Sequence, residues 1–128
     1  MNLKINMTEY SLIDSSLWID YLVNGNFKDI IEKEEKLLLA TISLIEIKKK
    51  LSKLKIPNKE ITNKIDYIKR QSIIINLDEK IAEKASKLVI EKNLPIADSI
   101  IYASAIINNA VLLTLDNDFR GLDNVKIF

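Results

Sequence analysis

Separate segments of the chain each place a carboxylate at or just beyond an apolar run. Carboxylates crowded into one cleft repel one another and raise one another's pKa unless a cation lies among them. Mg²⁺ and Mn²⁺ prefer oxygen ligands, and Mg²⁺ keeps several waters, so a few acids can hold it. Phosphodiester hydrolysis is the chemistry that most often uses such a site. The acids are Asp14, Glu46, Asp98 and Asp116, with Asp118 as a fifth.

The composition of the 128-residue chain removes most other reaction classes. It contains no Cys and no His, which excludes thiol chemistry, disulfides, the usual zinc sites and Ser-His-Asp triads. Gly25 and Gly121, its two glycines, lie too far apart to build a phosphate-binding loop. The formal net charge of +1, from 19 basic and 18 acidic residues, neither indicates nor excludes a nucleic-acid partner.

Each acid also has a purely structural interpretation. Asp14 suits a helix cap, and Asp98 near a helix N-terminus gains favourable dipole energy. Glu46 lies about 120° from the centre of its helix's apolar face, which suits either solvent or a site. Asp116 suits an ordinary turn. Their convergence favours a site, because otherwise every one of these structural interpretations must hold at once.

Strands alternating with helices position these acids. Because the strands are apolar on both faces, we expect a parallel sheet covered by helices on both sides. Ligands of such open sheets bind beyond the carboxyl ends of the strands, where the acids fall. The predicted strands are Tyr10–Asp14, Leu37–Thr41, Ser72–Asn76, Val111–Leu115 and Val125–Phe128. The predicted helices are SLWIDYLV, with Ser15 and Ser16 as N-cap types, then Phe27–Glu35, Ser43–Lys55 with Leu44, Ile47, Leu51 and Leu54 on one apolar face, Asn58–Arg70, Asp78–Lys92 and Pro95–Asn109.

In order and spacing, the segments LIDSSLWIDYL, ATISLIEIKKKL, LPIADSIIYASAI and LLTLDNDFRGL resemble a PIN-domain protein of the VapC toxin type over essentially the full chain. The resemblance implies one PIN-like domain over residues 1–128, an α/β fold in which a three-layer α/β/α sandwich surrounds a central, mostly parallel five-stranded sheet. It also implies a Mg²⁺- or Mn²⁺-dependent endoribonuclease, the toxin of a toxin–antitoxin pair, acting on tRNA or another structured RNA. Such proteins are usually homodimers, and a small antitoxin protein neutralises them.

The resemblance also assigns roles to residues. Of the two acids in L-D-N-D-F, we favour the first. Residues Met1–Thr8 precede the matched segment. Either Met7 is an alternative start of the chain, or these extra residues lengthen the first strand. The expected catalytic residues are Asp14, Glu46, Asp98 and Asp116, the expected metal ligands are Asp14, Asp98, Asp116 and Asp118, and the expected supporting hydroxyls are Ser15 and Thr114.

Three further features have open interpretations. Basic residues crowd the central helical hairpin and either bind RNA phosphates through counterion release or only face solvent. Arg120 beside the acidic loop either touches substrate or does not. We expect Trp18 in the core or a dimer interface rather than as a base-stacking platform. The basic residues are Lys48, Lys49, Lys50, Lys53, Lys55, Lys59, Lys64, Lys69 and Arg70.

The chain lacks the apolar segment of a secretory signal, and its most apolar stretches are too polar for a membrane span. We therefore expect a cytoplasmic protein without a membrane partner. A second hypothesis is a non-catalytic PIN-like interaction module, whose signature would be the loss of one or two acids. A third is a phosphotransferase with Asp14 as the phosphorylated residue, but phosphatases of that type carry a second Asp where this chain has Ser16.

Overall fold

The computed structural model describes residues 10–33 and 36–128, which fold around a central five-stranded sheet of their own. The strand order is β3-β2-β1-β4-β5 and every pairing is parallel, which confirms the predicted sheet. The expectations for Met1–Thr8, including a start at Met7, lie outside the described residues. The strands are β1 (Tyr10–Ile13), β2 (Leu37–Ala40), β3 (Ser72–Ile75), β4 (Ala110–Thr114) and β5 (Val125–Ile127).

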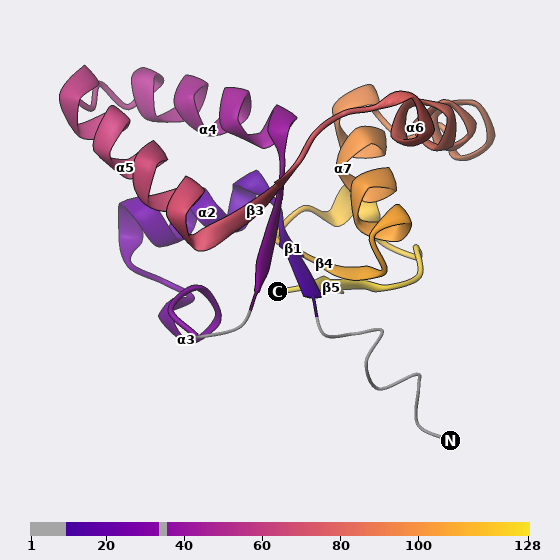
Figure 1. The fold of residues 1–128 in the computed structure, drawn as a ribbon, viewed down its shortest axis with the longest axis horizontal. Coiled ribbons are helices and arrows are strands. Elements are labelled where there is room, and N and C mark those ends of the chain that lie inside the picture. Colours follow the sequence, from indigo (N-terminus) through magenta and orange to yellow (C-terminus); the bar gives the residue numbers. More distant parts are fainter. Residues whose placement is uncertain (1–9, 34–35) are drawn as a thin grey trace.

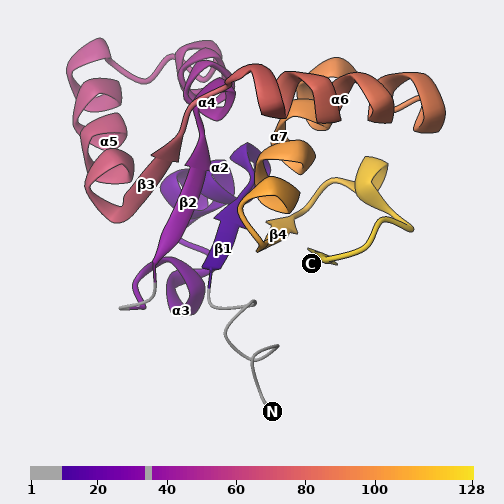
Figure 2. The same ribbon diagram turned by 45° about the vertical axis from the view of Figure 1, so that its right-hand side comes forward.

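Helices cover both faces of the sheet and complete the predicted three-layer α/β/α sandwich. Helices α2 to α5 lie on one side of the strands, and α6 and α7 lie on the other (Figures 1 and 2). The helices are α2 (Ser15–Asn24), α3 (Lys28–Ile31), α4 (Thr41–Lys53), α5 (Asn58–Gln71), α6 (Glu79–Lys92), α7 (Ile96–Ile107) and the short 3₁₀ helix η1 (Asn117–Phe119).

Two apolar clusters, one on each side of the sheet, hold the layers together. Leu12 and Leu38 pack into the cluster formed with α6 and α7. Their chain neighbours Ile13, Leu37 and Leu39 pack into the cluster formed with α2, α4 and α5. Successive strand residues point to opposite faces, so a strand buried on both sides must be apolar at every position. This requirement explains the uninterrupted apolar runs in the sequence.

The helices meet these clusters through the apolar faces that the sequence predicts, with one exception. Ile47 and Leu51 of α4 are fully buried, but Leu54 is 46% exposed. The prediction for Leu54 is wrong because α4 ends at Lys53 and the chain then turns, with Lys55 in the left-handed region at φ 62°.

Three predicted boundaries also need correction. Phe27 adopts φ 64°, which a right-handed helix does not allow, so α3 begins only at Lys28. The predicted extension of this helix to Glu35 is also wrong, because α3 ends at Ile31 with Glu32 as its C-cap. Helix α4 starts at Thr41, directly after β2, rather than at Ser43. With no loop between them, β2 delivers the first turns of α4 straight to the edge of the sheet.

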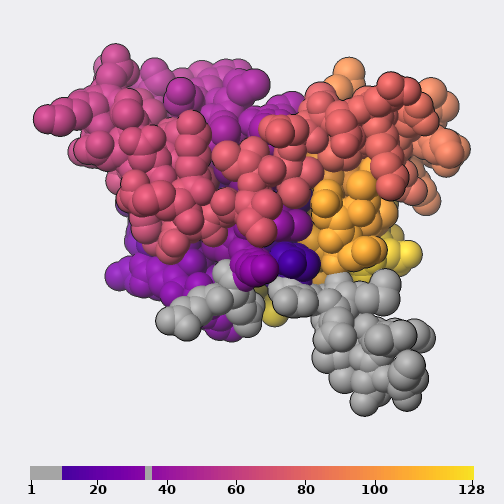
Figure 3. All heavy atoms as spheres, in the orientation of Figure 1, coloured from indigo at the N-terminus to yellow at the C-terminus, as the bar shows by residue number. Residues whose placement is uncertain are grey.

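The space-filling view shows α5, β3 and α6 along the front of the molecule, with helices rising at both upper corners (Figure 3). Because all five strands run the same way, their carboxyl ends lie at one edge of the sheet. Within residues 10–33 and 36–128, no helix has the length and apolar character needed to cross a membrane.

The central position of β1 leads to a first prediction. Leu12 is completely buried, so Leu12→Ala should lower the free energy of unfolding by about 2–5 kcal/mol, through lost burial and the cavity left behind. Ile90→Ala is the control, because Ile90 is 82% exposed and its truncation should cost less than about 0.5 kcal/mol. Urea unfolding followed by circular dichroism measures both values, and equal costs would contradict the two-sided burial of β1.

Candidate functional site

Asp14 is the single residue between the end of β1 and the start of α2. Its side chain is only 4% exposed, and Oδ2 accepts hydrogen bonds from Thr114 Oγ1 at 2.7 Å and Ser16 Oγ at 2.9 Å. It stands at the N-cap position, yet its carboxylate forms no side-chain cap hydrogen bond with α2. The structure therefore does not support the interpretation of Asp14 as a simple helix cap.

The hydroxyls of the buried Thr114 and the half-buried Ser16 join the ends of β1 and β4. The register that pairs Ile13 with Leu113 brings the next residues, Asp14 and Thr114, together. Thr114 Oγ1 also accepts the backbone N–H of Asp116 at 2.9 Å. Ser16 Oγ in turn accepts the N–H of Leu115 at 3.1 Å. These bonds hold the loop after β4 against the start of α2.

Ser16 is a member of the site that the sequence analysis missed. The expectation that Ser15 and Ser16 act as N-caps is wrong, because α2 begins at Ser15 and both hydroxyls reach acids instead. The available signal is the position of Ser16, two residues after an acid that ends a buried strand. At that distance it lies in the first turn of the helix, on the same rim as the acid.

Glu46 faces the site rather than solvent. Its side chain is half-buried, and Oε1 accepts a hydrogen bond from Ser15 Oγ at 3.0 Å. Because α4 follows β2 without a loop, Glu46 lies in the first turns of α4, at the rim of the sheet. The hydroxyl of Ser15 thus positions Glu46, whereas the hydroxyls of Thr114 and Ser16 position Asp14.

Asp98, Asp116 and Asp118 form the tightest group of acids. One carboxylate oxygen from each lies within 4.8 Å of the others. Asp98 stands in the first turn of α7, after Pro95. Asp116 precedes η1, and its Oδ1 accepts the N–H of Asp118 at 2.9 Å, so this side chain both shapes the turn and joins the group. The preference for Asp116 over Asp118 as a metal ligand stays a prediction, since the structure groups both with Asp98.

Burial and nearby negative charge raise the pKa values of Asp14, Glu46 and Asp98. Burial raises the pKa of Asp98 to about 7, and the nearby charge of Asp116 and the carboxyl of Asp118 add to the shift. Burial is also the main cause that raises the pKa of Asp14, although the hydrogen bonds from Thr114 and Ser16 act against it. The pKa of Glu46 rises through burial and then through Asp14 and Asp116, against the Ser15 hydrogen bond.

This set of groups fits a hard divalent cation. All its members offer oxygen atoms, and no cationic side chain of the described residues contributes to the pKa shifts of Asp14, Glu46 or Asp98. Oxygens that share one Mg²⁺ lie about 3–4 Å apart, and further when a water intervenes. The grouping of Asp98, Asp116 and Asp118 within 4.8 Å is close to that spacing. Asp14 and Glu46 lie outside this tight group but close to it, since the charge of Asp14 raises the pKa of Asp98 and the charge of Asp116 raises the pKa of Glu46.

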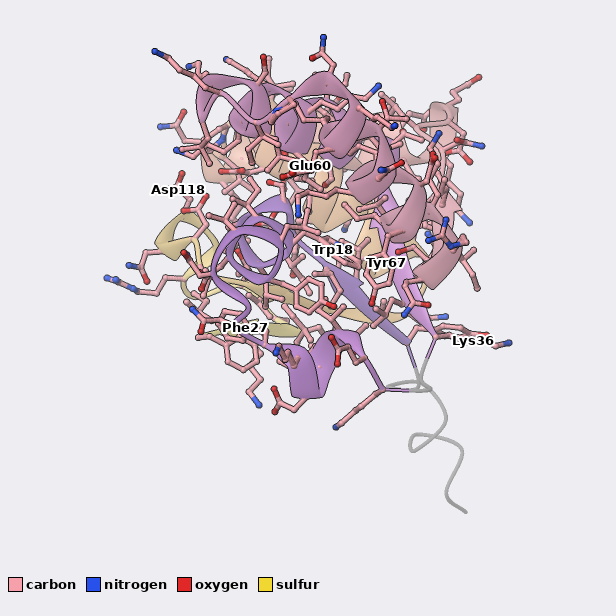
Figure 4. The ribbon with its side chains drawn as sticks, turned by 90° about the vertical axis from the view of Figure 1, so that its left-hand side faces the viewer. Trp18, Phe27, Lys36, Glu60, Tyr67 and Asp118 are labelled. Carbon is pink, nitrogen blue, oxygen red and sulfur yellow. The ribbon has the colours of Figure 1, made fainter. Side chains whose placement is uncertain are left out.

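The remaining sequence candidates lie in different environments. Trp18 is completely buried in the cluster with α2 and α4, which confirms a core position rather than a stacking platform. Its ring contacts Tyr21 edge-on, with centroids 6.0 Å apart. Arg120 is exposed directly after η1. In Figure 4, Trp18 lies inside the molecule and Asp118 lies at its edge.

Comparisons with known proteins agree with this geometry. The family model described as PIN domain matches residues 11–125. A toxin–antitoxin complex from Klebsiella pneumoniae has a chain with the same fold, at a TM-score of 0.76 and 23% identity, covering 91% of this chain and 95% of that chain. VapBC2 from Rickettsia felis, bound to a promoter DNA fragment, gives 0.71 and 22%, covering 93% and 97%. VapC20 from Mycobacterium tuberculosis, described as a Sarcin-Ricin loop cleaving toxin, gives 0.68 and 13%, covering 91% and 98%. No curated protein matches.

The raised pKa of Asp98 leads to a second prediction. Because this pKa is about 7 in the folded state and near 3.8 in the unfolded chain, the folded state binds more protons between these values, and stability falls as pH rises. In EDTA, Asp98→Asn should therefore raise the melting temperature more at pH 8 than at pH 5. Thermal unfolding at both pH values measures the difference.

Asp66→Asn on the exposed surface of α5 is the matched control and should show no such dependence on pH. An Asp98→Asn effect that is the same at pH 5 and pH 8 would contradict the charge repulsion inferred for the cleft.

Proposed function

The chain belongs to the PIN domain family, and on that premise we propose that it is a divalent-metal-dependent endoribonuclease that hydrolyses RNA phosphodiester bonds. The observation that carries the proposal is the convergence of Asp98, Asp116 and Asp118 within 4.8 Å, near the buried Asp14 and the half-buried Glu46. An uncompensated cluster of this kind costs folding free energy, which a bound cation would recover.

Each acid has a proposed role. Asp98, Asp116 and Asp118 hold a Mg²⁺ or Mn²⁺ ion. Asp14 binds the same ion directly or through water, and hydrogen bonds from Thr114 and Ser16 keep its carboxylate in place. When bound, such an ion neutralises charge on the phosphate and lowers the pKa of water. Glu46 stands at the side of the cluster, where its raised pKa suits it to accept a proton from an attacking water. The Ser15 hydroxyl keeps Glu46 aimed at that position.

The biological setting is part of the same proposal. We propose that the chain is the toxin of a toxin–antitoxin pair, on the grounds of the resemblance to VapC proteins and the fold shared with toxin–antitoxin complexes. Its substrate is tRNA or another structured RNA, in the cytoplasm where such RNAs occur. Its partners are a small antitoxin protein and a second copy of the chain in a homodimer.

Two other functions fit the structure less well. A non-catalytic interaction module has no need for a complete set of acids, and this chain keeps all the expected acids near one another. A phosphotransferase would need Asp14 to reach an incoming phosphate. With 4% exposure and hydrogen bonds from Thr114 and Ser16, Asp14 is poorly placed to act as a nucleophile.

The third prediction tests the nuclease. Purified protein should cleave tRNA in Mg²⁺ or Mn²⁺ and lose this activity in EDTA. Asp14→Asn and Asp98→Asn should each lower the cleavage rate by roughly 100-fold or more, because each removes a charge from the site. Rates are measured from labelled RNA on denaturing gels.

Asp66→Asn, which removes an exposed acid from α5, should cleave at the unmodified rate. Cleavage that survives EDTA, or that survives both Asp14→Asn and Asp98→Asn, would overturn the proposal. Toxicity on expression that Asp98→Ala leaves unchanged would favour the interaction module instead.

The fourth prediction concerns the antitoxin. A short open reading frame beside this gene should encode a protein with a DNA-binding N-terminal part and a basic C-terminal tail, since basic side chains complement the acidic cleft. Its co-expression should relieve toxicity, and the two proteins should purify together. A metal-dependent nuclease with no such neighbour would keep its proposed activity but lose its proposed setting.

A further inference from the structure

Helix α4 carries a run of lysines that begins just beyond the acid cluster. The helix starts at the carboxyl end of β2, where the site lies, and runs away from it to Lys53. Lys48, Lys49 and Lys50 follow Glu46 after one buried residue, Ile47, and all of these lysines are exposed. In Figure 4, nitrogen-tipped side chains project into solvent from the upper helices, with Asp118 below them at the edge of the molecule.

The hydrogen bond between Ser15 and Glu46 fixes which lysines share the face of the site. It turns the Glu46 side of α4 toward the acids. At about 100° per residue, Lys49, Lys50 and Lys53 lie within about 60° of Glu46 around the helix. We call these three residues the α4 lysine stripe.

The stripe runs away from the acids along the helix axis. With a rise of about 1.5 Å per residue, its members lie roughly 4–11 Å beyond Glu46. Lys48, about 160° away around the helix, faces the opposite direction. It therefore offers a matched control of the same type on the same helix.

The acid cluster creates a need for such a stripe. RNA phosphates are repelled by carboxylates, so a substrate must gain its affinity from cations beside the cleft. Arg120, two residues after Asp118 and directly after η1, is also exposed. Exposed positive charge thus follows the acids in two separate segments, although the chain as a whole has a net charge of only +1.

We propose that the α4 lysine stripe binds the RNA backbone and positions it across the acid cluster. This inference rests on the proposed nuclease function and specifies how its substrate lies. Lysines are point charges on flexible stems, so the stripe holds phosphates without reading bases. The stripe residues are positioning residues, and the acids remain the proposed catalytic groups.

The fifth prediction tests the stripe through RNA binding. Fluorescein-labelled tRNA is titrated with protein that carries Asp98→Asn, so that the RNA stays intact, and anisotropy is followed over a series of salt concentrations. Lys49→Gln, Lys50→Gln and Lys53→Gln together should weaken binding by roughly 10-fold and reduce the slope of log K against log salt by about 2, since each lost phosphate contact removes about 0.7–0.9.

Two controls separate position from net charge. The triple variant Lys80→Gln, Lys84→Gln and Lys87→Gln removes the same charge from α6, on the other side of the sheet. It should leave the slope of log K against log salt unchanged. Lys48→Gln should bind as before, whereas Lys50→Gln should bind more weakly. Melting temperatures should stay equal, because the stripe residues are exposed.

Kinetics separate this inference from the nuclease itself. In Mg²⁺, with Asp98 intact, the triple variant of the stripe should raise KM and leave kcat nearly unchanged, as expected for lost binding rather than lost chemistry. A stripe variant that binds RNA like the unmodified protein, or an α6 control that weakens binding equally, overturns the stripe. RNA binding through the stripe without any cleavage in metal would instead overturn the nuclease and leave the stripe standing.

Discussion

Repulsion among like charges is the constraint on which the rest of this structure depends. Asp14, Glu46, Asp98 and Asp116 come from distant parts of the chain, and the fold brings them together although burial and mutual charge raise the pKa of three of them. The apolar clusters on both faces of the sheet must outweigh that cost. Hydroxyl groups offset part of it, since Thr114 and Ser16 donate to Asp14 and Ser15 donates to Glu46.

The parallel sheet is what makes this convergence geometrically simple. Parallel strands end at one edge, and in this molecule β1, β2 and β4 each deliver an acid to that edge, directly or through the element that follows. The fourth contribution comes from the N-terminus of α7, the helix that packs on β4. Strand register places Asp14 beside Thr114, whereas the positions of Asp116 and Asp118 depend on the turn after β4, which hydrogen bonds to Thr114 and Asp116 hold in place.

Much of this arrangement could be predicted from the sequence, and the failures have physical causes. The buried strands and the isoleucine face of α5 follow from periodicity alone, and the rule for strand ends brought the acids to one rim. The predictions that Leu54 is buried and that a helix begins at Phe27 failed because Lys55 and Phe27 adopt positive φ, which apolar periodicity does not reveal. Ser16 was missed because a serine near a helix start has several uses, and only the contact with Asp14 distinguishes them. The ranking of Asp116 and Asp118 depends on carboxylate orientation, which sequence does not encode in any readable pattern.

The strand order has a consequence for the synthesis of the protein. β1 and β2 leave the ribosome early, with Asp14 and Glu46, but the strand that pairs with the other side of β1 is β4, from residues 110–114. Asp98, Asp116 and Asp118, together with Thr114, belong to the last quarter of the chain. A chain that is only half synthesised therefore contains Asp14 and Glu46, but lacks the group of Asp98, Asp116 and Asp118 and the Thr114 hydroxyl that donates to Asp14. Any chemistry that depends on this acid cluster therefore requires the last quarter of the chain to be synthesised and folded.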